Sequence, residues 1–260
     1  MRITIITQED AFVLPENVEL VLMQEGVELS SIIILDVKGA LTNKKKLFIQ
    51  GFGLRQATKM AFYMYGCKTW NALDRIFGYS LPGVKRSINA VARKHGVAYR
   101  VVSSVKSPQF IKSIQEEEPD LIISFSAPLI FPPELLAAPT KACVNLHCSY
   151  LPEHSGVLPS FWAIYHDEEY TGATVHLMDD RIDNGGILAQ EKVPITAGMS
   201  MFQLIKKTKR VGGRLMCEVI KTYQNNSVTQ VANATDPDAY HTWPTLDQLK
   251  EFRKKGGRLV

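Results

Sequence analysis

Short apolar runs alternate with amphipathic stretches through the first 147 residues of the chain. The apolar runs predict buried strands over 3–7, 31–37, 98–102, 121–125 and 143–147. The amphipathic stretches between them predict helices over 15–26, 84–95 and 108–117. Continuous apolar strands that alternate with helices indicate a mostly parallel sheet covered on both faces. We therefore predict an α/β, Rossmann-like fold, in which ligands bind beyond the carboxyl ends of the strands.

The pattern changes after residue 172, where two extended segments, 173–179 and 186–195, are separated by the polar turn "DRIDNG". A long amphipathic helix is predicted from Ser200 onwards. Its interior contains Gly212 and Gly213, each of which costs about 1 kcal/mol relative to alanine. We expect this pair to mark either close helix packing or a kink. Near the end of the chain, a capping box of Thr245 and Gln248 predicts a short helix.

The domain organisation follows from these elements. Residues 1–224 are predicted to form one domain, and residues 225–260 a C-terminal tail with a short helix. Within the domain, 53–79 has helical spacing and is interpreted as an insertion of two helices that break at Gly66. Its role stays open, since it could cover a substrate site or form the surface of a homodimer.

Composition and charge narrow the class of protein. Hydrophobic residues make up 45% of the chain and charged residues 22%, which is typical of a soluble globular protein. The net charge of +4 permits an anionic small ligand but is too small for a dedicated nucleic-acid binder. Four cysteines without Cys-x-x-Cys spacing indicate reduced thiols. With no apolar signal segment or membrane span recognised, the expected location is the cytoplasm.

The stretch "CVNLHCSYLPEHSGVLP" at 143–159 carries the candidate chemistry. Side chains two apart on a strand share a face, so Asn145 and His147 project together while Leu146 faces packing. An amide beside an imidazole suits acyl-group chemistry, but it also suits a hydrogen-bonded polar pair at a strand end. Asp183, in the turn between the two later strands, could likewise be an ordinary turn residue.

Two other kinds of site are disfavoured by the same stretch. His147, Cys148 and His154 lack the spacing of a zinc site, so no metal is predicted. Ser149 lacks the Gly-x-Ser-x-Gly context of a serine nucleophile.

Residues 119–195 resemble the catalytic core of the folate-dependent formyltransferases. The matching features are Asn-x-His, the "SYLP" loop, "FWAI", "TGATVHLMD" and "IDNGGIL", in the order and spacing of that superfamily. The superfamily includes methionyl-tRNA formyltransferase, glycinamide ribonucleotide formyltransferase and the N-formyltransferases of nucleotide-linked amino sugars. The resemblance implies a formyltransferase fold with a short C-terminal extension, and a one-carbon group transferase.

The resemblance also implies roles for individual residues. Asn145, His147 and Asp183 match the catalytic amide, imidazole and aspartate, the formyl donor would be 10-formyltetrahydrofolate, and the acceptor would be a primary amine. The pterin pocket would be formed by two segments, whose residues are Ala127, Leu129, Ile130, Asp179, Asp180, Arg181 and Ile182. For Leu129 and Ile130, simple core packing is the alternative interpretation.

Departures from the superfamily bear on the acceptor. The first strand runs into "TQEDAFVLPENV", which offers no glycine to cradle a phosphate, so a ribonucleotide acceptor is disfavoured. About 65 residues follow the matched core, too few for the C-terminal barrel of the tRNA enzymes. We therefore expect a small-molecule amine, with a nucleotide-linked amino sugar favoured, and neither a nucleic-acid nor a membrane partner.

Three alternatives to this expectation remain. They are a methionyl-tRNA formyltransferase without the barrel, a 10-formyltetrahydrofolate hydrolase with the same three catalytic residues, and a folate-binding relative without activity. Basic residues at 206–210, Arg214 and 253–255 indicate either a solvated helix face or contact with a phosphorylated acceptor.

Overall fold

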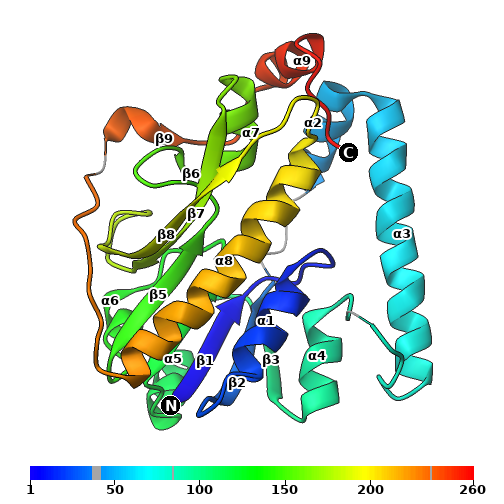
Figure 1. Cartoon of the computed structure of the whole chain (residues 1–260). Coiled ribbons are helices and arrows are strands. Elements are labelled where there is room, and N and C mark those ends of the chain that lie inside the picture. Colours follow the sequence, from blue (N-terminus) through cyan, green and yellow to red (C-terminus); the bar gives the residue numbers. More distant parts are fainter. Residues whose placement is uncertain (37–41, 84, 235) are drawn as a thin grey trace.

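The computed structural model describes residues 1–36, 42–83, 85–234 and 236–260. Within these residues, a seven-stranded sheet has the order β3-β2-β1-β4-β5-β7-β8 (Figure 1). Strands β1 to β5 run parallel, and β7 is antiparallel to both of its neighbours. The strand bounds are β1 Arg2–Thr7, β2 Glu28–Leu35, β3 Ala98–Val102, β4 Leu121–Phe125, β5 Ala142–His147, β7 Tyr170–Leu177 and β8 Ile187–Pro194. The predicted mostly parallel α/β sheet is therefore confirmed.

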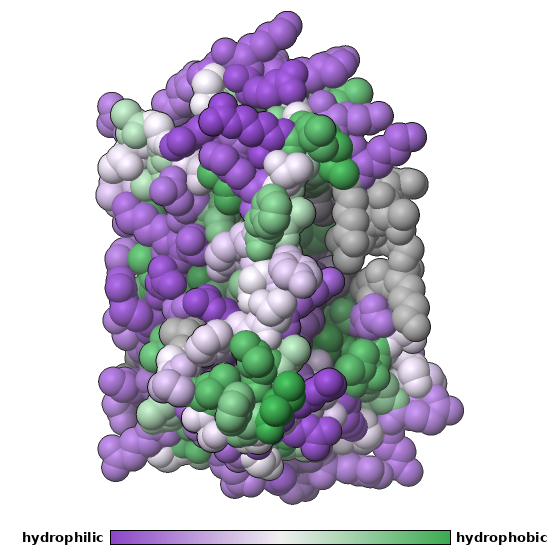
Figure 2. Space-filling view, turned by 90° about the vertical axis from the view of Figure 1, so that its right-hand side faces the viewer, coloured by the Kyte–Doolittle hydropathy of each residue, from purple (hydrophilic) through white to green (hydrophobic). Residues whose placement is uncertain are grey.

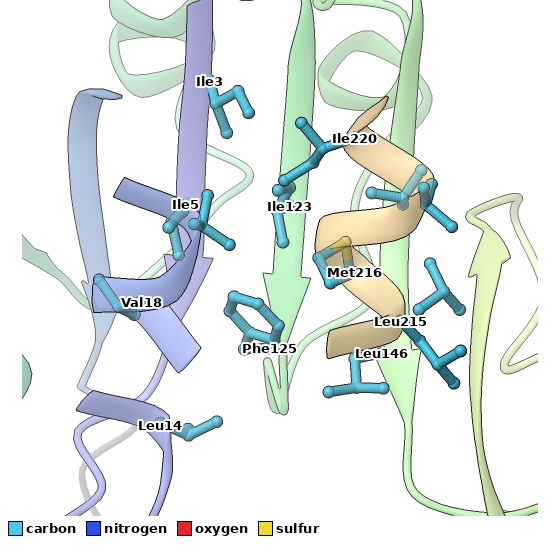
Figure 3. Close-up of a cluster of buried hydrophobic side chains, with 14 of the residues drawn as sticks. Ile3, Ile5, Leu14, Val18, Ile123, Phe125, Leu146, Leu215, Met216 and Ile220 are labelled. Atoms are coloured by element: carbon cyan, nitrogen blue, oxygen red, sulfur yellow. The ribbon is translucent and has the colours of Figure 1, made fainter. Parts of the chain in front are cut away.

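Helices cover both faces of the sheet. One face carries α1 Leu14–Leu22, α4 Ile88–His95 and α8 Met201–Gln224, and the other carries α5 Pro108–Glu116 and α6 Pro133–Leu136. Strand alternation divides the core accordingly: Ile123 and Leu146 belong to the α1–α8 side, whereas Ile122 and Cys143 belong to the α5–α6 side. Figure 3 shows side chains of α1 and α8 converging on β1, β4 and β5.

The predicted boundaries of the early elements need small corrections. Helix α1 ends at Leu22, four residues before the predicted end at Gly26, because residues 23–26 form the turn that returns the chain to β2. Gly26, with φ of 72°, serves that turn. Val37 and Val84, which were included in the predicted strand 31–37 and helix 84–95, lie outside the described residues. Helix α4 begins at Ile88 because the Ser87 side chain caps it.

The expected break at Gly66 is wrong. Helix α3 runs from Leu54 to Ile76 through Gly66 as one helix, and it follows a helix that the sequence analysis missed, α2 Thr42–Phe52. Inward contacts hold α3 on both sides of the glycine: the ring of Tyr63 lies against Phe12, and buried Asp74 pairs with Lys85 at 2.9 Å. A single glycine costs only about 1 kcal/mol in a helix, which is too little to interrupt one held in this way.

The C-terminal tail is fastened to the body by an aromatic cluster. It joins α2, α7 Pro159–Tyr165 and α9 Leu246–Lys254, and its buried members are Phe52, Phe161, Trp162, Met201, Leu249, Phe252 and Leu259. The predicted Thr245 capping box is present at the start of α9. A short parallel pair, β6 Ser155–Gly156 with β9 Tyr240–His241, adds a second attachment. The division of the chain after residue 224 stays a prediction. In the described part of the chain, no helix combines the length and apolarity needed to cross a bilayer.

The two glycines of α8 mark close packing, as one of the two expectations had it, and α8 is continuous through them. A Cβ at Gly212 would lie 2.3 Å from Leu146 of β5, and one at Gly213 would lie 2.3 Å from the Asn17 side chain of α1. Asn17 also donates a hydrogen bond of 2.9 Å to the carbonyl of Lys209. The glycines therefore set how closely α8 approaches the strand that carries Asn145 and His147.

Replacing Gly212 with alanine tests this contact. The new methyl group meets Leu146, and overpacking of this kind costs about 1–3 kcal/mol, partly offset by about 1 kcal/mol of helix propensity. We expect a net loss of about 1 kcal/mol in the free energy of unfolding, measured by denaturant titration. In a Leu146→Ala background the same change should cost nothing or stabilise, because the clashing atoms are gone. An equal cost in both backgrounds would contradict the contact.

Candidate active site

The structure brings the three predicted catalytic residues together at the carboxyl end of β5. Asn145 and His147 project from one face of that strand, and Asp183 reaches them from the turn between β7 and β8. The distance from His147 Nδ1 to Asp183 Oδ2 is 3.3 Å. His147 and Asp183 are 7% and 9% exposed, whereas Asn145 is half-buried and open to a ligand.

A fourth residue, His176 of β7, links the other three and was missed from the sequence. It lies opposite Asn145 in the β5–β7 register, with 3.1 Å between Asn145 Nδ2 and His176 Nε2. His176 Nδ1 donates to the carbonyl of Leu177 at 2.7 Å, since a carbonyl can only accept. Nε2 therefore accepts from Asn145 in the neutral ring, and in the protonated ring it faces Asp183 Oδ1 at 3.5 Å. One amide N–H of Asn145 stays available to a ligand.

Asp183 is a buried carboxylate surrounded by donors. Burial alone raises the pKa of this group, but the charge of His147, the hydrogen bond and charge of the protonated His176 ring, and the backbone N–H of Gly156 together outweigh burial. The result is a pKa of about 2, below the ordinary value of 3.8. The Gly156 N–H lies 2.8 Å from Asp183 Oδ2. Asp183 is therefore ionised at neutral pH.

The second nitrogen of His147 is also engaged. Nε2 donates to the carbonyl of His154 at 2.9 Å, which fixes the ring and leaves Nδ1 toward Asp183. His154 in turn contacts Glu168 at 2.6 Å through its own Nε2 and stacks on His241, with ring centroids 5.1 Å apart. Residue His241 belongs to β9, so the orientation of His147 depends on the C-terminal tail.

The same tail holds the turn that carries Asp183. Asn233 donates a hydrogen bond of 2.8 Å to the carbonyl of Asp183, and Val231 forms a β-bridge with Ile187 at the start of β8. The turn is tight, because a Cβ at Gly185 would lie 2.0 Å from the Leu177 carbonyl. Asp183 itself has φ of 50°, in the left-handed region that an aspartate tolerates better than most residues.

A buried ion pair lies near the trio of Asn145, His147 and Asp183. Lys209, grouped with the basic residues from the sequence, points inward and pairs with Asp10 at 2.6 Å. The pair lies near Cys148, which follows His147, and burial raises the pKa of the Cys148 thiol. Glu9 accepts a hydrogen bond of 2.8 Å from the backbone of Ile88 at the start of α4. Two carboxyl groups thus follow β1 directly.

Two of the residues predicted to bind the pterin, Ala127 and Leu129, lie on the same side of the sheet as Asn145 and His147. Ala127 and Leu129 pack on the α5–α6 cluster together with Met178, which precedes the second predicted segment. Leu129 is therefore partly buried by core packing, as the alternative interpretation allowed. Ile130 and Ile182 are 52% and 44% exposed and remain open for contact. In the second segment, Asp179 accepts hydrogen bonds from the Arg181 backbone and the Asn184 side chain, while Asp180 and Arg181 are exposed.

The remaining basic residues of α8 line a separate hollow. It has a volume of ≈ 560 Å³, and its walls consist of Glu191, Gln203, Lys206, Lys207, Arg210, Val211 and Arg214. Arg210 pairs with Glu16 at 2.9 Å, and Arg214 with Glu191 at 3.3 Å. The hollow includes none of Asn145, His147 and Asp183. This arrangement fits a solvated helix face better than a part of the catalytic site.

Comparison with protein families matches residues 83–220, more than half of the chain, to the formyl transferase family. A methionyl-tRNA formyltransferase from Clostridium perfringens is 35% identical over 143 residues, which are 55% of this chain and 46% of that protein. The chain thus spans about half the length of the curated relatives it matches.

Solved structures share the fold. A sugar N-formyltransferase from Shewanella sp. aligns with a TM-score of 0.60 and 17% identity, over 97% of this chain and 87% of that one. Glycinamide ribonucleotide transformylase 1 from Symbiobacterium toebii aligns with a TM-score of 0.62 and 17% identity, over 91% of this chain and 94% of that one. WlaRD, a sugar 3N-formyl transferase solved with dTDP and 5-N-formyl-THF, aligns with a TM-score of 0.59 and 17% identity, over 97% of this chain and 78% of that one.

The lowered pKa of Asp183 makes the stability of the fold depend on pH. Because the pKa is lower in the folded state, the stabilisation is present above the ordinary value of 3.8 and is lost as the pH falls toward about 2. We expect this loss to be about 2 kcal/mol, absent in Asp183→Asn, when the free energy of unfolding is compared between about pH 5 and about pH 2.

A matched control for this comparison is Asp247→Asn, which changes an exposed carboxylate on α9. It should keep the acid dependence of the native chain. If Asp183→Asn kept it too, the proposed electrostatic environment of Asp183 would be wrong.

Proposed function

Because the chain belongs to the formyl transferase family, we propose that it moves a formyl group from 10-formyltetrahydrofolate to a primary amine of a small molecule, with a nucleotide-linked amino sugar as the favoured acceptor. The observation that carries this proposal is the group formed by Asn145, His147 and Asp183. An amide N–H, an imidazole and an ionised carboxylate meet at the carboxyl edge of a mostly parallel sheet, where such folds bind ligands.

The arrangement supplies the two things that acyl transfer to an amine requires. Negative charge develops on the formyl oxygen as the amine attacks, and the free N–H of Asn145 and a protonated His147 would stabilise it. The amine must also lose a proton. Asp183, whose Oδ2 atom lies 3.3 Å from His147 Nδ1, would hold the protonated His147 or a bridging water in place. The proton of the amine would pass through that water to the departing folate nitrogen.

The predicted pterin segments fit a flat, partly polar ring system. When bound, 10-formyltetrahydrofolate would supply the activated formyl carbon. Such a ring needs an apolar slot with polar backbone at its rim. Ile130 and Ile182 offer apolar surface that is about half exposed, and Leu129, next to Ile130 in the sequence, packs against the α5–α6 cluster. The backbone of residues 127–130 and 179–182 would supply the rim.

The segment after β1 favours an acceptor without a phosphate at that position. Glu9 already occupies backbone N–H groups at the start of α4, where an anion would otherwise bind. Asp10 adds a second carboxyl group, although Lys209 neutralises it. A phosphate placed there would meet carboxylates rather than free donors, which disfavours a glycinamide ribonucleotide. The solved structures that share the fold include sugar N-formyltransferases and a glycinamide ribonucleotide transformylase. The preference for an amino-sugar acceptor therefore rests on the two carboxylates after β1.

Methionyl-tRNA is the second candidate acceptor, because the curated relatives at up to 35% identity are methionyl-tRNA formyltransferases. The basic residues of α8 would be the obvious contact for tRNA phosphates. Arg210 and Arg214, however, are already paired with Glu16 and Glu191. This candidate therefore ranks below a small-molecule amine.

Replacement of His147 with alanine tests the mechanism. We expect the rate of formyl transfer to fall by about 10²–10⁴-fold, because proton handling and charge stabilisation are both lost. Folate affinity, measured by calorimetry, should stay within a few-fold of the native value. His95→Ala is the matched control, because His95 is the last residue of α4, pairs with Glu19 of α1 and should leave turnover unchanged. Near-normal turnover by His147→Ala would contradict the mechanism.

An acceptor screen separates the candidate functions. The native protein is incubated with 10-formyltetrahydrofolate and a panel of amino-sugar nucleotides, simple amines or methionyl-tRNA, and tetrahydrofolate production is followed. We expect turnover with an amino-sugar nucleotide and little without an amine. Rapid formate release in the absence of an amine would instead identify a hydrolase. Preferred use of methionyl-tRNA, with affinity that falls steeply with salt, would identify the tRNA enzyme.

A further inference from the structure

Helix α3 contacts the rest of the molecule along one narrow face. On that face Tyr63 lies against Phe12 and Phe202, with ring centroids 5.8 Å and 5.0 Å away, and Asp74 pairs with buried Lys85. Only Cys67 and Asp74 of its 23 residues are buried. Figure 1 shows the helix at the right-hand edge of the molecule, separate from the layers that cover the sheet. A helix of this length with a single anchored face leaves most of its circumference exposed.

From Phe62 to its C-terminal end, the outward face of α3 is mostly apolar. Phe62 is 77% exposed, Tyr65 67% and Ile76 74%. Spacings of three, four and seven residues place these side chains on one face of the helix. We call this surface the α3 stripe, and its residues are Phe62, Tyr65, Gly66, Thr69, Trp70, Leu73, Ile76 and Phe77. Figure 2 looks at this side of the molecule and shows apolar patches among polar surface.

Gly66 forms a notch in the middle of the α3 stripe. A Cβ at this position would have nothing within 4 Å among the described residues, so no internal contact of the fold requires a glycine here. The residue also lies in regular helix, where its conformational freedom costs stability. Small residues on an exposed helix face allow another helix to approach closely. Gly66 therefore leaves room for a second helix to cross α3 closely at this point.

The charges on the α3 stripe favour a second copy in the antiparallel direction. Arg55 and Lys59 lie on the same face at its N-terminal end, and Leu73, Ile76 and Phe77 lie at its C-terminal end. Parallel pairing would place cation against cation. Antiparallel pairing about Gly66 brings Arg55 and Lys59 of each copy over the apolar end of the other, where Phe77 can accept a cation–π contact.

The exposed area is sufficient for a specific interface. Phe62, Tyr65, Trp70 and Phe77 alone expose about 500 Å² per copy at about 200 Å² for each ring. Two copies would bury about 1,000 Å² from these rings, which reaches the lower bound for a biological interface. The aliphatic residues of the α3 stripe add to this area.

We propose that two copies of this chain associate through the α3 stripe as an antiparallel, two-fold symmetric helix pair that crosses at Gly66. The interface is isologous, so it closes at a dimer. Tyr63 of the same helix packs on Phe12, two residues after Asp10. The dimer therefore also braces the segment that follows β1 at the edge of the candidate active site.

Oligomeric state measured by sedimentation tests the proposal. The native chain should form a concentration-dependent dimer, and Gly66→Gln should raise its dissociation constant at least about tenfold by filling the notch. Ala61→Gln introduces the same side chain at an exposed position off the α3 stripe and should leave the dimer unchanged. Equal melting temperatures at low protein concentration would show that both variants fold. A monomeric native chain, or a Gly66→Gln variant that dimerises normally, overturns the proposal.

Cross-linking tests the direction of pairing. Gly66→Cys lies at the crossing point and should form a disulfide-linked dimer under mild oxidation. Lys59→Cys should not, because the two copies lie about 20 Å apart in an antiparallel pair. Efficient cross-linking through Lys59→Cys would indicate parallel pairing and contradict the proposed geometry. A native chain that stays monomeric and co-sediments with anionic phosphatidylserine vesicles would identify lipid as the occupant of the α3 stripe and overturn the dimer.

Discussion

The ionised carboxylate of Asp183 is the constraint around which this part of the molecule is arranged. A buried charge is tolerated only when donors and opposite charge surround it. His147 of β5, His176 of β7 and the Gly156 N–H of β6 meet that requirement, and Asn233 of the tail holds the turn in place. Four separate segments therefore have to converge before the charge can be buried. The geometry of the candidate site is a consequence of that convergence.

One face of strand β5 packs against α8 in the core, and the other face carries the residues of the candidate site. Leu146 fits beneath Gly212 of α8, while Asn145 and His147 point toward the opposite side. Because successive side chains alternate, a shift of one residue in register would turn the imidazole toward α8 and the leucine toward the candidate site. The glycine in α8 thus acts on the site from a distance, since it permits the approach that keeps Leu146 seated.

Sequence periodicity was sufficient to predict features that depend only on neighbouring residues. The strands 98–102 and 121–125 and the shared face of Asn145 and His147 depend only on alternation within a few residues. His176 could have been found by pairing "TGATVHLMD" against β5, because it faces Asn145 across the sheet. The roles of His241 and Asn233 could not have been found this way. Their contacts depend on tertiary packing between segments 50 or more residues apart, and the same is true of the contact of Tyr63 with Phe12 that helps to hold α3.

Two segments of the chain lie around the candidate site. One matches the formyl transferase family, and the other precedes that match. Residues 83–220, shared with the formyl transferase family, contain Asn145, His147, Asp183 and most of α8. The first 82 residues contain β1 with Glu9 and Asp10, and they contain α3 with its apolar outer face. Tyr63 and Phe12 join these two features physically. The residues of the proposed group transfer therefore lie in the segment shared with the family, whereas the proposed dimer surface and the two carboxylates after β1 lie in the N-terminal segment, and that aromatic contact connects the last two.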